Sequence, residues 1–172
     1  MDLESVVVFL AGGTQPIVRF IIQFALIVGL VGSAAFLLRA RKVAKHSTET
    51  TGMGRIAAGI AFCCCLMSLR QFMNSGAHTL GYGDVSFDAV TYASQSTFGL
   101  GAAVVNAILT ILRAVGAYFF YKGVKGLKDS QLEGNTELSA SGLIGKSLTQ
   151  MVCGLLLIFN PEVMDSFLTA IN

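Results

Sequence analysis

The chain has 172 residues, of which 53% are hydrophobic and 13% are charged; its mean hydropathy is +0.68 and its net charge is +2. An average soluble domain carries about 25% charged residues, so this chain lacks the polar groups that would cover a soluble globule. The composition excludes soluble enzymes, disordered tails and collagen-like fibres, and it predicts a protein embedded in lipid. The small net charge also argues against a nucleic-acid binder that works by neutralising phosphates.

The N-terminal segment 1–17 is expected to lie on the outer side of the membrane. Its first four residues, Met1 to Glu4, carry acids where a secretory signal carries cations, so no signal peptide is predicted there. The first apolar span then runs from Phe20 to Leu38, which is 19 residues without a charge. That length is close to the ~20 residues that a helix needs to cross a bilayer.

Three further apolar segments follow, at Ile56–Leu69, Phe98–Tyr121 and Ser147–Pro161. The first of them is expected to continue past Arg70 toward Met73, and the last is followed by an amphipathic tail. The chain is therefore predicted to be an all-α membrane protein with four apolar helices. The second and fourth spans are short, so they need a thinned bilayer, snorkelling side chains or protein neighbours.

The four spans are predicted to form two tandem hairpins, at 18–75 and 98–172, each with a basic loop. A Gly-rich connecting loop on the outer side, 76–97, separates them. The two halves look alike, because Val31–Phe36 can be laid over Val115–Phe120. With a second loop that is seven residues longer, Gly54-Arg55 then meets Gly145-Lys146. This pattern is typical of a duplicated hairpin in parallel orientation.

Nine of the 12 basic residues fall in the loops after the first and third spans. They are Arg39, Arg41, Lys42, Lys45, Arg55, Lys122, Lys125, Lys128 and Lys146. The positive-inside rule places both loops in the cytoplasm and both chain ends outside. The same charges have a second interpretation, in which they line the bore of an assembly or bind lipid head groups.

The third span carries one polar stripe, formed by Asn106, Thr110 and Arg113. A charge at the depth of Arg113 costs a few kcal/mol, and the apolar spans contain no acid to pair with it. Its head group is expected to reach an interface by snorkelling, or to face a lumen, a lipid phosphate or a neighbouring subunit. This polar face of the third span is therefore predicted to contact a protein partner or an aqueous path and not lipid.

The segment Thr79–Asp84, with sequence TLGYGD, is similar to the selectivity filter of potassium channels, in which backbone carbonyls replace the water shell of the ion. Its setting between two spans fits the alternative function of a potassium-type ion channel. The residues before it are polar and broken by glycine, whereas a filter needs an apolar pore helix there. A Gly-rich outer turn explains the same residues and is preferred.

No catalytic constellation is found, and the protein is predicted not to be an enzyme. His46 and His78 lie apart in loops, and the sequence contains no nucleophile elbow or phosphate-binding loop. The cysteines, Cys63–Cys65 and Cys153, lie inside apolar runs without the paired spacing of a zinc site. They are interpreted as packing residues, and no metal is predicted.

The second half carries a pattern of apolar residues, glycine, an aromatic pair and Lys-Gly over Ile111–Lys128, followed after a polar loop by Gly145–Leu148 and Cys153–Leu157. In this pattern it resembles the IcmC/DotE/TraQ family of small membrane proteins of type IVB secretion and I-type conjugation systems. The resemblance covers about 60 residues, and the first hairpin fits it more loosely. It implies a structural subunit of a conjugative machine in a bacterial inner membrane, which contacts other subunits of the machine and carries no catalytic residue.

Each hairpin also resembles the pilins of type IVA systems. This second resemblance implies a homo-oligomer that assembles into an extracellular pilus, with basic loops facing a lumen through which single-stranded DNA–protein cargo passes. It also implies phospholipid bound between subunits, with no other cofactor. The candidates for contacting the lumen or lipid phosphate are Arg41, Lys42, Arg113, Lys122, Lys125 and Lys128.

Overall fold

The computed structural model describes residues 3–45, 51–94, 99–131 and 137–171. Every regular element in these ranges is helical, and none of them contains a β-strand. The elements are α1 (Leu3–Gly12), α2 (Thr14–Lys45), α3 (Thr51–Met67), α4 (Leu69–Thr79), the short 3₁₀ helix η1 (Gly99–Gly101), α6 (Ala102–Ser130), α7 (Glu137–Ile158) and α8 (Asn160–Ile171).

Three helical segments are long and apolar enough to cross a membrane: Ser5–Lys45, Ala102–Ser130 and Ser141–Ile158. The bent pair of α3 and α4 makes a fourth if it is counted as one span. The prediction of an all-helical protein whose apolar helices suit a membrane is therefore confirmed.

The first predicted span is the middle of a much longer helical segment. Only one residue, Gly13, separates α1 from α2, and its N–H donates to the carbonyls of Phe9 and Leu10 at 3.3 and 3.1 Å. The Thr14 hydroxyl donates to the carbonyl of Ala11 at 2.7 Å, so the polar groups at this interruption are paired and Ser5–Lys45 forms one helical segment. The N-terminal segment is consequently helical from Leu3 onward.

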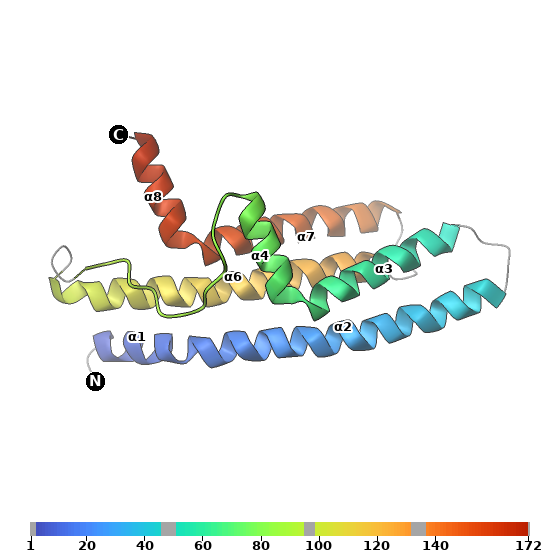
Figure 1. The fold of residues 1–172 in the computed structure, drawn as a ribbon, viewed down its shortest axis with the longest axis horizontal. Helices are drawn as coiled ribbons and strands as arrows, with labels where there is room; N and C mark the ends of the chain where they lie inside the picture. The colour runs from blue at the N-terminus through green and yellow to red at the C-terminus, as the bar shows by residue number, and fades with distance from the viewer. Residues whose placement is uncertain (1–2, 46–50, 95–98, 132–136, 172) are drawn as a thin grey trace.

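The second predicted span does not continue straight to Met73, which corrects the sequence-based expectation. The chain bends by 94° between α3 and α4, at Ser68. The Ser68 hydroxyl donates to the carbonyl of Cys64 at 2.9 Å, and such back-bonding to the preceding turn bends helices. Hence α4 crosses the other helices instead of extending α3 (Figure 1).

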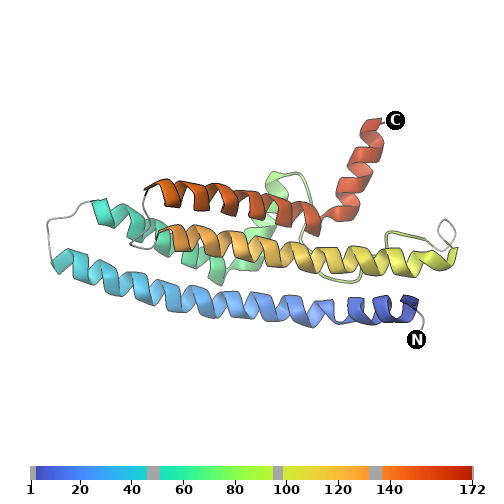
Figure 2. The same cartoon turned by 180° about the vertical axis from the view of Figure 1, so that it is seen from behind.

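Helix α6 is the centre of the fold. It packs against α1, α2, α3, α7 and α8. Figures 1 and 2 show α2, α6 and α7 side by side in one layer, with α3 and α4 against one face of it. The core between these helices contains apolar side chains from all of them, including Val18, Leu66, Met73, Phe120, Val124 and Ile158.

The fourth predicted span ends at Ile158, three residues earlier than expected. Pro161 has no N–H, and its ring clashes with the carbonyl four residues earlier, so α7 cannot continue through it. The Asn160 amide donates to the Leu109 carbonyl at 3.0 Å and fixes this break against α6. The predicted tail is the helix α8, which turns away from the layer (Figures 1 and 2).

Candidate functional site

All nine cations predicted for the two basic loops lie on helices, which corrects that expectation. Arg41 and Lys42 are exposed near the end of α2, and Lys122 and Lys125 are exposed on α6. Lys128 lies in the last turn of α6 and is half-buried. Ala, Leu, Lys and Arg all favour helix, so both helices continue well past their apolar runs. Residues 46–50 and 132–136, the rest of these loops, lie outside the described ranges.

Two contacts fix the register between α2 and α6. The ring centroids of Phe24 and Tyr121 are 6.5 Å apart. Farther along both helices, the Lys128 side chain lies against Gly32, with its Cδ 3.4 Å from the position that a Cβ on this glycine would occupy. Because the two helices run in the same direction (Figure 1), each residue of α6 lies level with the residue of α2 numbered about 97 lower.

This register places two exposed lysines at the depth of the apolar part of α2. Lys125 lies level with Val28 and Gly29, close to the midpoint of the uncharged run Phe20–Leu38. Lys122 lies one helical turn farther from the basic end. Sequence reasoning missed this depth because the lysines follow the apolar run of their own helix.

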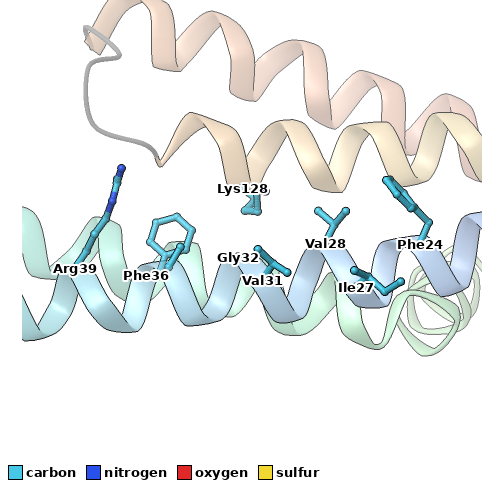
Figure 3. Close-up of a pocket in the computed structure, with 9 residues that line it drawn as sticks. Phe24, Ile27, Val28, Val31, Gly32, Phe36, Arg39 and Lys128 are labelled. Atoms are coloured by element: carbon cyan, nitrogen blue, oxygen red, sulfur yellow. The ribbon is translucent and has the colours of Figure 1, made fainter.

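An apolar groove of about 430 Å³ lies between α2 and the end of α6 (Figure 3). Its walls are mainly side chains of α2. They are Phe24, Ile27, Val28, Val31, Gly32, Ala35 and Phe36, with Arg39 and Lys128 as the two cations. An apolar groove with one cation at its end and a second in its middle fits an amphiphile with an anionic head group.

The two cations of the groove come from two helices: Arg39 lies at one end of the α2 wall, and Lys128 lies opposite Gly32 in the middle of it. Figure 3 shows Lys128 pointing from α6 toward α2 and Arg39 reaching up from α2. The Lys128 ammonium is 3.3 Å from the Asp129 carboxylate, and its side chain is 14% exposed. Of the predicted site residues, only Lys128 lines this groove. Arg39 belongs to the predicted loop cations but not to the predicted site. Its position directly after the uncharged run Phe20–Leu38 is the sequence feature that could have indicated its place at the groove.

Arg113 lies apart from the groove, near the break between α7 and α8. Its Nε donates to the Ile158 carbonyl at 3.0 Å and its Nη1 to the Ser86 carbonyl at 3.3 Å. The Glu162 carboxylate is 3.7 Å from Nη2, and the Arg113 side chain is only 14% exposed. The expectation that its partner lies outside this chain is therefore corrected. The acid comes from the first turn of α8, which begins beside α6 before the helix turns away.

The rest of the polar stripe holds the extended segment 82–94 along α6. The Asn106 side chain accepts from Ala93 N–H at 2.7 Å and donates to Ala93 C=O at 3.0 Å. The Thr110 hydroxyl accepts from Val90 N–H at 3.0 Å. The Tyr92 hydroxyl donates to Asp165 at 2.8 Å, which raises the pKa of Tyr92 and ties the segment to α8. The stripe thus contacts this chain's own backbone.

We expect Arg113→Leu to lower the free energy of unfolding by about 2–3 kcal/mol, since it leaves two carbonyls without their charged donor. Unfolding by sodium dodecyl sulfate in mixed micelles, followed by circular dichroism, measures the change. Arg55→Leu is the control: this arginine is exposed on α3, where a substitution changes stability by less than about 0.5 kcal/mol. Equal stability of the two variants would show that the contacts of Arg113 contribute nothing.

The segment Thr79–Asp84 forms the last residue of α4 and the turn that follows it. The N–H groups of Leu80 and Tyr82 both donate to the Ala77 carbonyl at 3.0 Å, and Gly81 has a φ of +82°. Asp84 accepts from Asn74 at 3.1 Å and is 3.1 Å from His78 Nε2. The Tyr82 ring stacks on Phe159 at 4.9 Å. These contacts are those of a capped turn packed against the end of α7.

Within the ranges that the structure describes, no three His, Cys, Asp or Glu side chains are grouped to hold a metal ion. Cys63 is buried between α2 and α3, whereas Cys64 and Cys153 are exposed. The absence of a metal and of catalysis stays a prediction.

The fold thus defines a class, an all-helical protein with helices suited to a membrane. Comparison with family models, curated proteins and solved structures gives no match. The resemblance to the IcmC/DotE/TraQ family stays a prediction, and a function has to be argued from the geometry.

Proposed function

We propose that this protein is a structural membrane subunit that assembles with copies of itself around an aqueous lumen. The observation that carries the proposal is the exposure of Lys122 and Lys125 at the depth of the apolar run of α2. A lysine near the bilayer centre costs about 2.5–3.5 kcal/mol even on the insertion scale. A lumen lined by this face of α6 removes that cost, because the ammonium groups then stay in water.

The length of the apolar surface also favours assembly. In the register of the two helices, Ala102 at the start of α6 lies level with the beginning of α1, while the apolar run of α2 ends at Leu38. Together the two apolar stretches extend over about 50 Å, compared with a hydrocarbon slab of about 30 Å. The slab leaves part of this surface uncovered, including Phe9, which is 82% exposed. Contact between copies would bury it.

The tandem-hairpin arrangement is part of the proposal. The sequence alignment of the two halves pairs Gly32 with Gly116. When it is extended through the second loop, which is seven residues longer, it also pairs Cys63 with Gly154. In the structure a Cβ on Gly32 would meet Cys63, and a Cβ on Gly116 would meet Gly154, at 2.8 and 2.7 Å. Equivalent positions therefore make the close contact in α2–α3 and in α6–α7, as expected of a duplicated hairpin.

We assign the apolar groove to a membrane phospholipid. Arg39 and Lys128 would contact its phosphate, and the α2 side chains would contact an acyl chain. The groove opens on α2, so the lipid would lie between this copy and its neighbour. Arg41 and Lys42, exposed beyond Arg39, stay candidates for the lumen or for other head groups.

For the biological setting we propose a conjugative type IVB secretion system of a bacterial inner membrane, with the chain as a pilin-like subunit of the transfer tube or as a fixed channel component. The support is the sequence resemblance together with the lysine face, which suits passage of a single-stranded DNA–protein cargo. Filaments sheared from donor cells and identified by mass spectrometry distinguish the two forms. A main component near 18.2 kDa indicates a pilin. Retention in the membrane fraction indicates a channel component.

The lumen itself is tested by labelling with a membrane-impermeant maleimide. In a chain whose four cysteines are replaced by serine, we expect Lys125→Cys in assembled membranes to react at least about tenfold faster than Leu30→Cys. Leu30 is the matched control, since it is exposed on α2 at nearly the same depth. Equally slow labelling of both positions would contradict an aqueous lumen at Lys125.

A further inference from the structure

A second, smaller cavity lies at the opposite end of the uncharged run of α2. Its volume is about 130 Å³, and it lies between α2, the start of α4 and the extended segment 82–94. The polar residues that line it are Gln15, Arg19, Arg70, Ser86 and Asp88. Its apolar lining comes from Val18, Ile22 and Phe87. The cavity is distinct from the groove at Arg39 and Lys128.

The charges around this cavity are unbalanced. Asp88 is the acid of the lining, and both of its oxygens are engaged: Oδ1 accepts from Gln15 Nε2 at 3.2 Å and Oδ2 from the Ser86 hydroxyl at 2.9 Å. Arg19 and Arg70 have no hydrogen bond or ion pair to any residue that the structure describes. Two guanidinium groups and one carboxylate leave a net charge of +1, which one monoanion would neutralise.

The cavity also lies at the depth of a membrane surface. Arg19 directly precedes Phe20, and Arg39 follows 20 residues later, so the two arginines are about 30 Å apart along the helix. This distance equals the thickness of a hydrocarbon slab. The 94° bend brings Arg70, at the start of α4, to the same level as Arg19.

We propose that Arg19 and Arg70 form a binding site for a phosphate group at this outer surface. A guanidinium presents paired N–H donors that match two phosphate oxygens, and this geometry favours arginine over lysine. A phosphodiester head group and free inorganic phosphate share that chemistry. The depth of the site, at the level of a membrane surface, favours the lipid. The site requires neither a lumen nor secretion, so it stands independently of the proposed function.

The test is native mass spectrometry of the full chain in detergent, with added phosphatidylglycerol. The variant Arg39→Gln/Lys128→Gln serves as the background, so that the groove contributes no phosphate contact. We expect this background to retain one phosphatidylglycerol, and the further change Arg19→Gln/Arg70→Gln to weaken retention about tenfold. Arg55→Gln, at an exposed arginine of α3, is the matched control and should retain the lipid. Circular dichroism verifies that each variant is helical.

The outcomes separate the two phosphate sources. Loss of the phosphatidylglycerol adduct on addition of millimolar inorganic phosphate would identify free phosphate as the ligand, whereas persistence of the adduct identifies the lipid. Arg19→Lys/Arg70→Lys should retain part of the affinity, because it keeps the charge and loses the paired donors. Equal retention by the Gln variant and its background, or no adduct in the background, overturns the proposal.

Discussion

The variant Gly154→Val will strongly destabilise the fold, because α6 and α7 approach each other closely at this glycine. A Cβ at this position of α7 would lie 2.7 Å from the amide nitrogen of Phe120 and 2.8 Å from the carbonyl oxygen of Gly116. Both atoms belong to the backbone of α6, so a side-chain rotation gives no relief and the two helices have to separate. Overpacking of this kind costs about 1–3 kcal/mol, and contact with backbone puts the expected loss at the upper end.

The measurement is unfolding by sodium dodecyl sulfate in mixed micelles, and Gly145→Val is the matched control. Gly145 lies on the same helix with nothing within 4 Å of an added Cβ. Valine has the same helix propensity at both positions, so only the contact with α6 differs. If both variants unfold at the same detergent fraction, α6 and α7 do not approach each other as closely at Gly154 as the structure indicates.

Under the proposed conjugative function, we expect the double variant Lys122→Glu/Lys125→Glu to lower plasmid transfer from donor cells about a hundredfold. At 4 Å in water a lysine attracts a phosphate by about 1 kcal/mol, and a glutamate repels it by the same amount. Two reversals, repeated in every copy around a lumen, exceed the ~2.7 kcal/mol that corresponds to a hundredfold change. Conjugation frequency is the readout, with the amount of the subunit in the membrane measured in parallel.

Two further variants make this experiment specific. Lys122→Arg/Lys125→Arg keeps the positive charge and should transfer normally. Gly83→Ala should also leave transfer intact, because Gly83 lies in the turn after α4; abolition of potassium flux by this change would instead support the ion-channel alternative. Normal transfer by the Glu variant, at a normal membrane level, would refute the lumen lined by α6.

Local chemistry explains what could be predicted at the level of individual elements. The run Phe20–Leu38 lies within α2, and the tail after Pro161 is helical, as expected. Apolar length and proline act over a few residues, so the sequence states them directly. The bend at Ser68 also has a local cause, but the sequence did not predict it. A serine within an apolar run is compatible with either a straight or a bent helix.

The candidate site was predictable only in part. Lys122, Lys125 and Lys128 were selected for their charge, but they were placed in a loop beyond the membrane. Arg19 and Arg70 were not selected, because they are 51 positions apart and only the bend brings them to one cavity. The sequence identifies Arg113 as a costly charge, but its partner Glu162 lies beyond a helix break that the sequence does not position in space.

The sequence by itself determined the class of this protein. Its low charge and long apolar runs require helices in a lipid environment, because backbone groups in lipid have to be satisfied within the segment itself. Only the tertiary structure decided at what depth each charge lies. That depth depends on the register between α2 and α6, which is set by the contacts of Phe24 with Tyr121 and of Gly32 with Lys128. Such contacts join residues almost 100 positions apart, where no local pattern carries information about distance.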